Sequence, residues 1–414
     1  MIKKRIPWVY LCLMLPITTV NALNLSQAEL IAIKRANEIK ELRYRQGELQ
    51  SEAIAAKQLP DPVLQLGAQN LPVDTFSLSQ EAMTQLQVGV MQVFPKGKTL
   101  KYRAEGLNQK ALSVSNQASL ERIGILKQVR TLWNQLYFWK SSRNILLKQR
   151  QTFLHLKEVA ASLYANDKVP QKDVLNAQLE LSRIDERLIT VEQKNDDTRV
   201  RLARWIGSKA AHDAHVEQFY PASRPVSRSI LKQSLLHHPK IRIDNANIAG
   251  AKSDIELAKQ DYLPGFSAGL VYGYRKNPGN PNINRPDFLS GTLKVSLPLF
   301  PKNRQSQRLH AKQQSLLSVQ ERFDADRKAL IESLDSNFVT YNKTKKKLKM
   351  YRRALLPEVK QYAESTVLAY QNNRSDFINV AQSHIRWLSL ELEQLKENLN
   401  NYQSKINLLY LQGK

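Results

Sequence analysis

The sequence has 414 residues and a formal net charge of +25, and only 14 of its residues are glycine. So few glycines argue against Gly-rich phosphate loops, and no HExxH motif, P-loop or nucleophile elbow is present. We therefore expect a protein that is not an enzyme and has no cofactor, catalytic residue or metal ligand. The positive charge suggests nucleic acid or an anionic membrane as a partner, but its spread along the chain is equally typical of solvated helices.

Residues 1–22 have the layout of a secretory signal peptide. A positive stretch at 3–5 precedes a mostly apolar run over 6–20, and small residues then offer a cleavage site before Leu23. A membrane anchor is the alternative, but the run is shorter than the ~20 residues that a spanning helix needs. Cys12, the only cysteine, is not preceded by the small residues of a lipoprotein signal. We predict a cleaved signal without lipidation and a mature chain without disulfides.

The mature chain begins with a predicted helix and two strands. A capping-box spacing over 26–29 starts the helix, which runs through Lys57 to two prolines that cannot donate backbone hydrogen bonds. Residues 64–68 and 86–93 alternate in character as two-faced strands do, and the polar stretch 70–83 between them is a predicted loop. The apolar phase of the second strand slips by one residue before it ends, which predicts a β-bulge.

A helix of unusual length follows over 98–163, a stretch without proline. At ~1.5 Å per residue it spans about 100 Å, a length for which a compact domain has no use. A turn at 164–173 leads into a return helix, and 207–225 is a linker. His212 and His215 share this linker, but paired linker histidines are more often solvated than metal-bound. The coiled-coil seam residues predicted in the two helices are Leu107, Ala111, Val114, Ala118, Ile125, Leu132, Leu136 and Trp139, then Leu181, Ile184, Leu188, Val191, Thr198, Leu202 and Trp205.

The second half repeats this order of elements. A helix over 227–263, interrupted by one proline, precedes strands over 266–274 and 289–297 with an exposed loop at 275–287. A long helix, a turn at 370–379 and a last helix complete the chain. The predicted seam residues are Leu334, Tyr341, Leu348 and Leu355, then Ile385, Leu388, Leu392, Leu395, Leu399, Tyr402, Ile406 and Leu409.

Two landmarks recur at one offset, which predicts a chain built twice. The run Phe-Pro-Lys at 94–96 recurs 206 positions later, and Tyr164 recurs as Tyr370 at the same offset. A duplication of this kind fixes the fold of both halves together. We predict a first repeat over 23–225 and a second over 226–414, each with a helix, a β-hairpin, a long helix and a return helix.

The predicted strands alternate as lipid on one face and a watery lumen on the other would require. A half-buried sheet in a soluble protein gives the same alternation, so the period alone does not decide between them. Four strands cannot close a barrel in one chain, and open strand edges are not tolerated in lipid. Several chains that pool their strands would solve this problem. The signal peptide and the long helices fit that solution, so the predicted fold is mainly α with a membrane β-barrel portion.

The order of elements resembles the TolC family of outer-membrane efflux channels over nearly the whole mature chain. Gln80-Glu81-Ala82-Met83-Thr84-Gln85, followed by Gln92-Val93-Phe94-Pro95 and Gly97-Lys98, is similar to the CzcC-like branch that serves heavy-metal efflux. The resemblance implies a homotrimer with a twelve-stranded barrel and an α-helical coiled-coil tunnel that reaches into the periplasm. It also implies three partners: outer-membrane lipid, a periplasmic adaptor (membrane fusion) protein and an inner-membrane RND pump.

The resemblance places a turn motif at the tip of each helical hairpin. The family has Tyr-x-x-Gly there, with Asp six residues after the Gly and Val next. The matching residues here are Tyr164, Asp167, Asp173 and Val174, then Tyr370, Asn373, Asn379 and Val380. Both glycines are replaced, but Asp and Asn tolerate a left-handed backbone better than most residues. We therefore expect both turns to form.

The resemblance also implies a gate at these tips. The carboxylates that ring the closed end in the family align with Asn379 and Gln382, whose neutrality weakens any cation-binding constriction. Asp173 fits a helix N-cap at least as well as a pore role. The predicted tip and gate residues are Asp167, Asp173, Asn176, Asn373, Asp376, Asn379 and Gln382. The predicted adaptor or pump contacts, which plain turn chemistry also explains, are Lys168, Val169, Pro170, Arg374 and Ser375.

The resemblance implies a passive outer-membrane exit duct of a tripartite efflux system, with heavy-metal cations as the cargo. A multidrug channel or a type I secretion channel is the alternative. A basic coiled-coil protein that binds nucleic acid is a third hypothesis, but it leaves the signal peptide and the strands unexplained. We expect a location in the outer membrane of a Gram-negative bacterium, with the helices in the periplasm and no nucleic acid as a partner.

Overall fold

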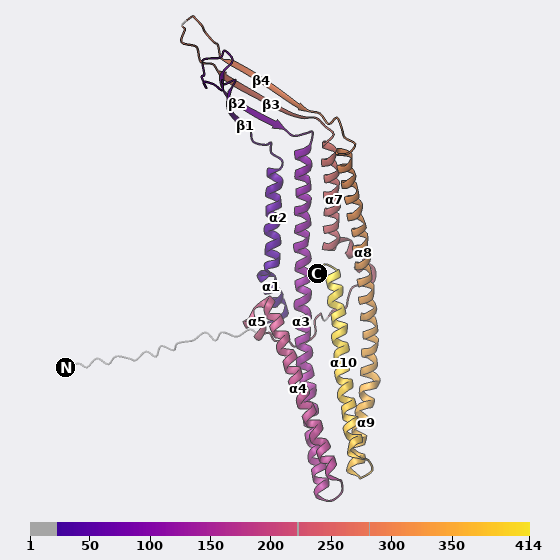
Figure 1. The fold of residues 1–414 in the computed structure, drawn as a ribbon. Helices are drawn as coiled ribbons and strands as arrows, with labels where there is room; N and C mark the ends of the chain where they lie inside the picture. Colours follow the sequence, from indigo (N-terminus) through magenta and orange to yellow (C-terminus); the bar gives the residue numbers. More distant parts are fainter. Residues whose placement is uncertain (1–22, 222, 281) are drawn as a thin grey trace, which may run out of the picture.

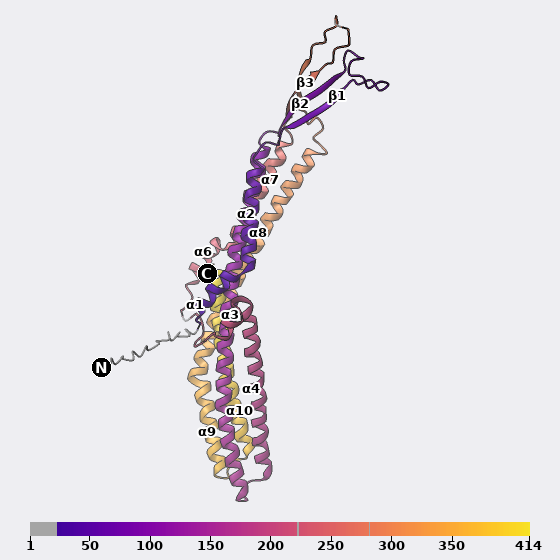
Figure 2. The ribbon, with the colours of Figure 1, turned by 90° about the vertical axis from the view of Figure 1, so that its left-hand side faces the viewer.

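The computed structural model describes residues 23–221, 223–280 and 282–414. The predicted signal peptide, including Cys12 and the small residues of the cleavage site, lies outside the described residues. The described chain is elongated, with a four-stranded sheet at one end and helices that run from it to the opposite end (Figures 1 and 2). Among the described residues, no helix combines the length and the apolar composition that a membrane crossing requires.

The first helical segment consists of two helices, α1 (Leu25–Arg35) and α2 (Asn37–Ala55). The capping box of α1 is made by Asn24 and Gln27, so the box predicted at 26–29 is wrong. Asn is as good an N-cap as Ser, and Gln27 stands where its side chain can reach back to the cap. The backbone leaves helical geometry at Ala36, where ψ is 104°, and this splits the single helix that the sequence predicts.

The sheet joins the two halves of the chain. Its strands are antiparallel in the order β1 (Val63–Gln69), β2 (Gln85–Phe94), β3 (Gly265–Tyr274) and β4 (Phe288–Ser296). The described ladder between β2 and β3 stays in step from end to end, so the predicted bulge is wrong. The slip in apolar phase instead marks Met91 and Val93, which occupy the face opposite to Val90 near the helices.

Helix α3 (Thr99–Ala165) has 67 residues, and α4 (Gln171–Ile206) returns along it. The seam residues predicted for both helices are all buried or half-buried, so the coiled-coil pattern is confirmed. The predicted linker contains a short helix, α5 (Ser208–His212), which the sequence analysis missed.

The second half begins with α6, whose N-cap Ser227 accepts a hydrogen bond from the Ile230 backbone as its position predicts. That helix, α6, spans Arg228–Ser234, and the helices that follow it are η1 (Leu235–His237), α7 (Pro239–Gln260), α8 (Gln305–Met350), η2 (Tyr351–Leu355), α9 (Leu356–Gln371) and α10 (Phe377–Leu411).

A π-helical turn, η2, explains why the predicted seam fails at Leu355. The first three seam residues of the long helix are buried, but Leu355 is only half-buried. Pro357 cannot donate a hydrogen bond and crowds the preceding turn, which a wider π turn relieves. The extra residue in that turn shifts the phase, and burial resumes at Val359 and Ala363.

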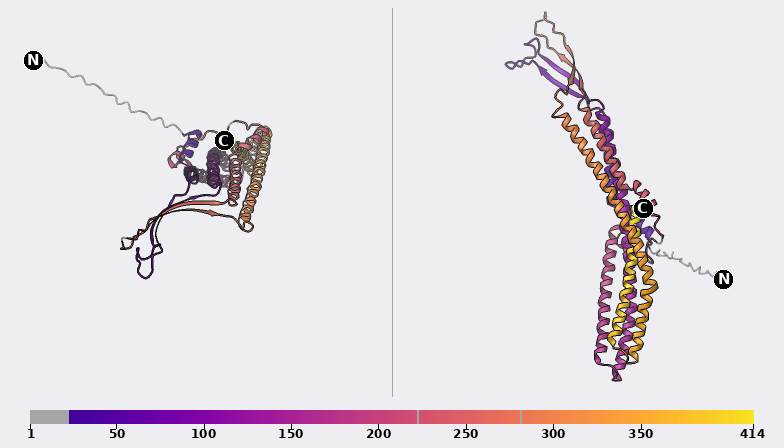
Figure 3. Two further views of the ribbon diagram at one scale, coloured as in Figure 1. Left: turned by 90° about the horizontal axis from the view of Figure 1, so that it is seen from above. Right: turned by 90° about the vertical axis from the view of Figure 1, so that its right-hand side faces the viewer.

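The helices form a curved wall rather than a closed bundle, as the view from above shows (Figure 3). Helices α2, α3, α7 and α8 stand side by side below the sheet, and α4, α3, α10 and α9 continue the wall to the far end. Three buried clusters lie along the wall. One surrounds Ile125 and Val129 at mid-height, one surrounds Phe153 and Phe377 in the hairpins, and a small one surrounds Leu334.

Candidate functional site: the sheet, the tips and their supports

The register of the sheet divides its side chains into two faces of opposite character. One face is apolar except at Gln92 and Gly291. It carries Leu64, Leu66, Ala68, Leu86, Val88, Val90, Phe94, Phe266, Ala268, Leu270, Tyr272, Tyr274, Leu289, Leu293 and Val295. The other face is mostly small or neutral polar, with Gln65, Gln69, Gln85, Gln87, Gly89, Ser267, Gly269, Ser290, Thr292 and Ser296. Leu66 is 72% exposed and Leu289 is 75% exposed, so the described chain leaves the apolar face uncovered. An exposed apolar surface of this extent marks contact with lipid or with another protein.

The two outer strands, β1 and β4, have no partner on their free sides within the described residues. Three antiparallel pairings separate them, so they run in opposite directions. The β4 edge of one copy can therefore pair antiparallel with the β1 edge of another, which is the pairing that a closed antiparallel sheet needs.

The joint between sheet and helices ties the two halves of the chain together. The buried side chain of Gln260 accepts a hydrogen bond from the Lys98 backbone at 2.9 Å, and Lys96 Nζ donates to the Asp261 carbonyl at 3.4 Å. Gly97 has a φ of +45°, and a Cβ there would lie 2.3 Å from Leu263 Cδ1. Only glycine fits this backbone and this space.

The tip turns of both helical hairpins use left-handed residues. Asp167 has a φ of +53° and Asn373 has a φ of +56°, so the expectation that both turns form around a left-handed Asp or Asn is confirmed. In each turn the residue that follows donates its backbone N–H to a carbonyl five positions earlier, Lys168 to Leu163 and Arg374 to Ala369. These bonds cap the helix that ends there.

One polar contact joins the two hairpins near their tips. Tyr370 is 1% exposed, and its hydroxyl donates to Asp173 Oδ2 at 3.3 Å. The N-cap of α4 is Pro170, so the prediction of an N-cap role for Asp173 is wrong: Asp173 is the third residue of the helix and points into the hairpin contact. Burial raises the pKa of the Asp173 carboxyl, although the hydrogen bond opposes the rise. Burial and the carboxylate also raise the pKa of Tyr370.

The equivalent positions at the 206-residue offset make no such contact among the described residues. Tyr164 is 44% exposed, and Asn379 is exposed with its amide donating to Ser375 Oγ at 3.2 Å. The sequence pattern marked the two tyrosines as landmarks and as members of the turn motif, but it did not identify Tyr370 as the partner of Asp173. The turn motif contains both residue types, but it does not show that Tyr370 of one hairpin meets Asp173 of the other.

The other predicted tip residues are spread over the two turns. Asp376 occupies the N-cap position of α10 without a side-chain capping bond, Asn176 is half-buried, and Gln382 is exposed. The residues predicted to dock a partner that are exposed are Lys168, Pro170 and Arg374, whereas Val169 and Ser375 are half-buried. Val169 also packs against the apolar core of the hairpins.

Similarity to a known sequence family covers part of the chain, whereas similarity in fold to solved structures covers most of it. Residues 230–414 match the family model described as outer membrane efflux protein. The similarity to this family therefore spans slightly less than half of the 414 residues, in the second half of the chain. No curated protein sequence matches the chain.

Solved structures share the fold over most of this chain. The outer membrane protein VceC from Vibrio cholerae is 12% identical with a TM-score of 0.80, and the match covers 94% of this chain and 96% of VceC. The outer-membrane channel OprN is 14% identical with a TM-score of 0.79, with 94% and 89% covered. The MtrE outer membrane channel of Neisseria gonorrhoeae, in its open state, is 12% identical with a TM-score of 0.74, with 94% and 88% covered.

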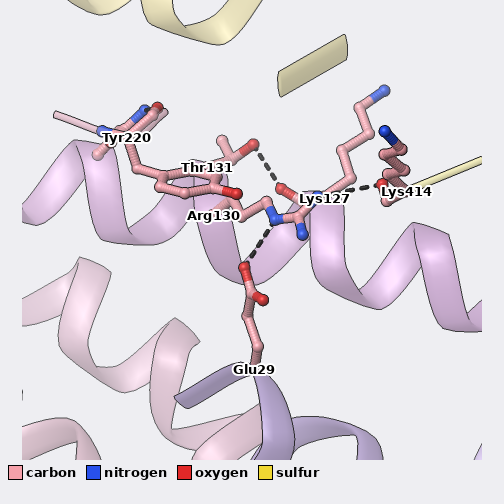
Figure 4. A network of polar contacts seen from close by, with 7 residues as sticks. Glu29, Lys127, Arg130, Thr131, Tyr220 and Lys414 are labelled. Carbon is pink, nitrogen blue, oxygen red and sulfur yellow. Dashed lines mark hydrogen bonds and ion pairs between the residues drawn. The ribbon is translucent and has the colours of Figure 1, made fainter. Parts of the chain in front are cut away.

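A buried polar network at mid-height holds the helical wall together, and no sequence pattern predicted it. Arg130 is 7% exposed and lies between Glu29 and Lys414, beside the ring of Tyr220 (Figure 4). Its Nε donates to Glu29 Oε1 at 2.7 Å, and its Nη1 donates to the Lys414 carbonyl at 3.0 Å. The network connects α1, α3, the linker and the end of α10, and it supports the wall rather than forming a site.

At the end of the sheet away from the helices, the loop between β3 and β4 donates hydrogen bonds to the loop between β1 and β2. Arg285 donates to the Ser79 and Glu81 carbonyls, each at 3.1 Å, and Arg275 donates to the Ala82 carbonyl at 3.1 Å. Within the described residues, no group of three or more His, Cys, Asp or Glu side chains is placed to hold a metal ion.

Proposed function

We propose that three copies of this chain form a passive exit duct, with a twelve-stranded barrel in the outer membrane and a helical tunnel in the periplasm. The observation that carries the proposal is the sheet, which combines an uncovered apolar face, an opposite small and polar face and two open edges. Lipid would cover the first face and water the second, and closure with two sister sheets would remove the edges.

The free edges of the helical wall support the same assembly. On α4, apolar side chains that return to one side of the helix face away from α3 and are 50–71% exposed: Leu175, Leu179, Ile189 and Val200. On the opposite edge of the wall, α8 and α9 leave Val339, Met350, Tyr362 and Leu368 44–61% exposed. A neighbouring copy on each side would bury both stripes, and the wall would close into a tunnel.

In the proposed duct, the tips of the helical hairpins are the part that moves when the tunnel opens. Tyr370 and Asp173 tie the two hairpins of one chain, so a tunnel that opens by separating its hairpins has to break this hydrogen bond. The exposed turn residues Lys168, Pro170 and Arg374, with Val169 and Ser375 beside them, would receive a periplasmic adaptor. An inner-membrane RND pump would supply the energy, because the chain has no site for energy-yielding chemistry in its sequence.

The order of elements in each half supports a tandem repeat, 23–225 and 226–414, after a cleaved signal peptide. Two landmark tyrosines and two left-handed tip residues share one offset. The cargo that we propose, heavy-metal ions, rests on the resemblance of residues 80–98 to the CzcC-like branch. A multidrug or type I secretion channel differs in cargo and pump but not in the duct.

The test is to express the full chain with its leader, fractionate the membranes and insert the purified protein into planar lipid bilayers. We expect an outer-membrane protein of three chains that conducts ions. A monomer that stays soluble without detergent would refute the duct. Deletion of the gene tests the cargo separately: sensitivity to zinc, cobalt, cadmium, copper or silver would support metal efflux, and sensitivity to drugs alone would support the alternative.

A further inference from the structure

The small and polar face of the sheet carries one formal charge. Lys294 in β4 is the only Lys, Arg, Asp or Glu in the four strands, and the register places it opposite Ser267 on that face. Ser267 in turn pairs with Val93, so Lys294 lies toward the helix end of the sheet. Its side chain is exposed.

We propose that Lys294 from three copies forms a ring of positive charge at the inner end of the barrel and makes the duct favour anionic solutes over cations. This inference rests on the proposed function, because the ring exists only if three sheets close around a lumen. No carboxylate in any strand can neutralise it. Charged side chains that line a pore set its preference between ions of opposite sign.

The segments that follow the strands strengthen the positive field. Lys98 lies four residues beyond β2, and Lys302 and Arg304 follow β4, all three of them exposed. At the opposite end of the molecule, Asn379 and Gln382 are exposed and neutral, so the tips supply no acidic ring at those positions to oppose it. An anion that crosses the proposed duct therefore meets no acidic ring at Asn379 and Gln382 and then a basic barrel mouth.

Lys294 has a simpler role to be weighed against this one. An inward-pointing lysine on an edge strand prevents sheets from adding to one another, and β4 is an edge strand in the single chain. That role concerns aggregation and predicts no effect on ion flow. The two roles are therefore separated by a measurement of charge selectivity.

Dissolved salt limits the expected preference of the duct for anions over cations. The Debye length is about 8 Å at physiological ionic strength and about 30 Å near 0.01 M, so three lysines around a wide lumen act strongly only in dilute salt. The ring would favour anions without blocking cations, and a metal cargo would cross the barrel most readily as a neutral or anionic complex.

The test measures the reversal potential of the purified full-length protein in planar bilayers across a KCl gradient, with the dilute side near 0.01 M. We expect chloride preference in the unaltered protein, loss of that preference in Lys294→Gln and inversion in Lys294→Glu. Lys294→Arg should keep it, and Thr292→Lys, which adds a second charge on the same face, should increase it. Lys209→Gln, in helix α5 beside the wall, is the matched control and should change nothing (Figure 1).

The outcomes distinguish the ring from the duct. Conductance with a reversal potential that is the same in the unaltered protein, Lys294→Glu and Thr292→Lys would overturn the ring and leave the duct standing. Cation preference in the unaltered protein would do the same. Absence of any conductance in outer-membrane trimers would overturn the duct and the ring together.

Discussion

Gly97 stands where the sheet meets the helices, and its backbone excludes any side chain. The Gly97→Ala variant places a Cβ 2.3 Å from Leu263 Cδ1 and 2.5 Å from Gln260 Oε1 at a φ of +45°. We expect a loss of roughly 1–3 kcal/mol in the free energy of unfolding, from backbone strain and overpacking. Thermal or denaturant unfolding measures it.

Gly47 provides the matched control for this prediction. It lies in the middle of α2, and a Cβ there meets nothing within 4 Å. Gly47→Ala should therefore stabilise the protein by up to about 1 kcal/mol through helix propensity. Equal effects of the two alanines would show that the joint is not the constrained element we describe.

We predict that two buried histidines, His238 and His384, make the free energy of unfolding depend on pH. Burial lowers the pKa of His238 to about 4, and it also lowers the pKa of His384, whose ring nitrogens have no partner among the described residues. The unfolded chain binds these protons first, so the free energy of unfolding falls as the pH drops from about 6.5 toward 4. The raised pKa of Asp173 acts in the opposite direction. The folded protein binds this proton first, so its uptake favours the folded state, but only as the pH falls close to the ordinary carboxyl range.

Unfolding at about pH 7 and about pH 5 tests this balance. We expect lower stability at the acidic pH, with a smaller drop in His384→Phe and in His238→Asn, which keeps a cap acceptor for the Lys240 backbone. The loss for His238 alone can reach about 3 kcal/mol at full protonation, since each pKa unit is worth about 1.4 kcal/mol. An unchanged drop in the double variant would contradict the assignment.

At the scale of elements, the contact between Tyr370 and Asp173 is the test of how the two hairpins are coupled. Tyr370→Phe leaves a buried carboxyl without its partner and should cost roughly 1–3 kcal/mol, and Asp173→Leu should remove most of that cost in the double variant. If the hydrogen bond also holds the tips shut, Tyr370→Phe raises open-channel conductance in bilayers. Tyr164→Phe, at the equivalent exposed position, should do neither.

The exposed stripe on α4 tests the assembly of the wall. Ile189→Glu and Val200→Glu put carboxylates where a neighbouring copy would bury apolar side chains, so both should weaken the trimer while the single chain keeps its helix content. Lys194→Glu, exposed but off the stripe, should leave assembly intact. Size-exclusion chromatography with light scattering reads the oligomer, and trimers of full strength in both stripe variants would show that α4 is not an interface.

The sequence predicts these elements where periodicity is strong and fails where chemistry competes locally. Alternation located all four strands, and heptad spacing located the seams of α3, α4 and α10. The bulge in β2 was wrong because an apolar residue near the helices can occupy the other face without breaking the ladder. The N-cap role of Asp173 was wrong because the tip of the other hairpin supplies its partner, and one sequence does not show which segments meet.

At the scale of the whole molecule, the chain is an incomplete wall topped by an incomplete sheet. Both have free edges, and the apolar surface on the sheet has no cover from the described residues. Burying it at about 25 cal/mol per Å² is the main gain that lipid and sister copies can offer. The buried network around Arg130 holds the wall together, and the joint at Gly97 links the sheet to the wall, so closure of one positions the other.

The most direct test of this account is a cysteine cross-link between the two edges of the sheet. The chain outside the predicted signal peptide has no cysteine, so one cysteine at Gln65 of β1 and one at Ser290 or Thr292 of β4 report only on each other. We predict disulfide-linked species of two and three chains in outer-membrane fractions, with none in variants that carry a single cysteine of the pair. Monomers alone, recovered in the soluble fraction without detergent, would contradict the account.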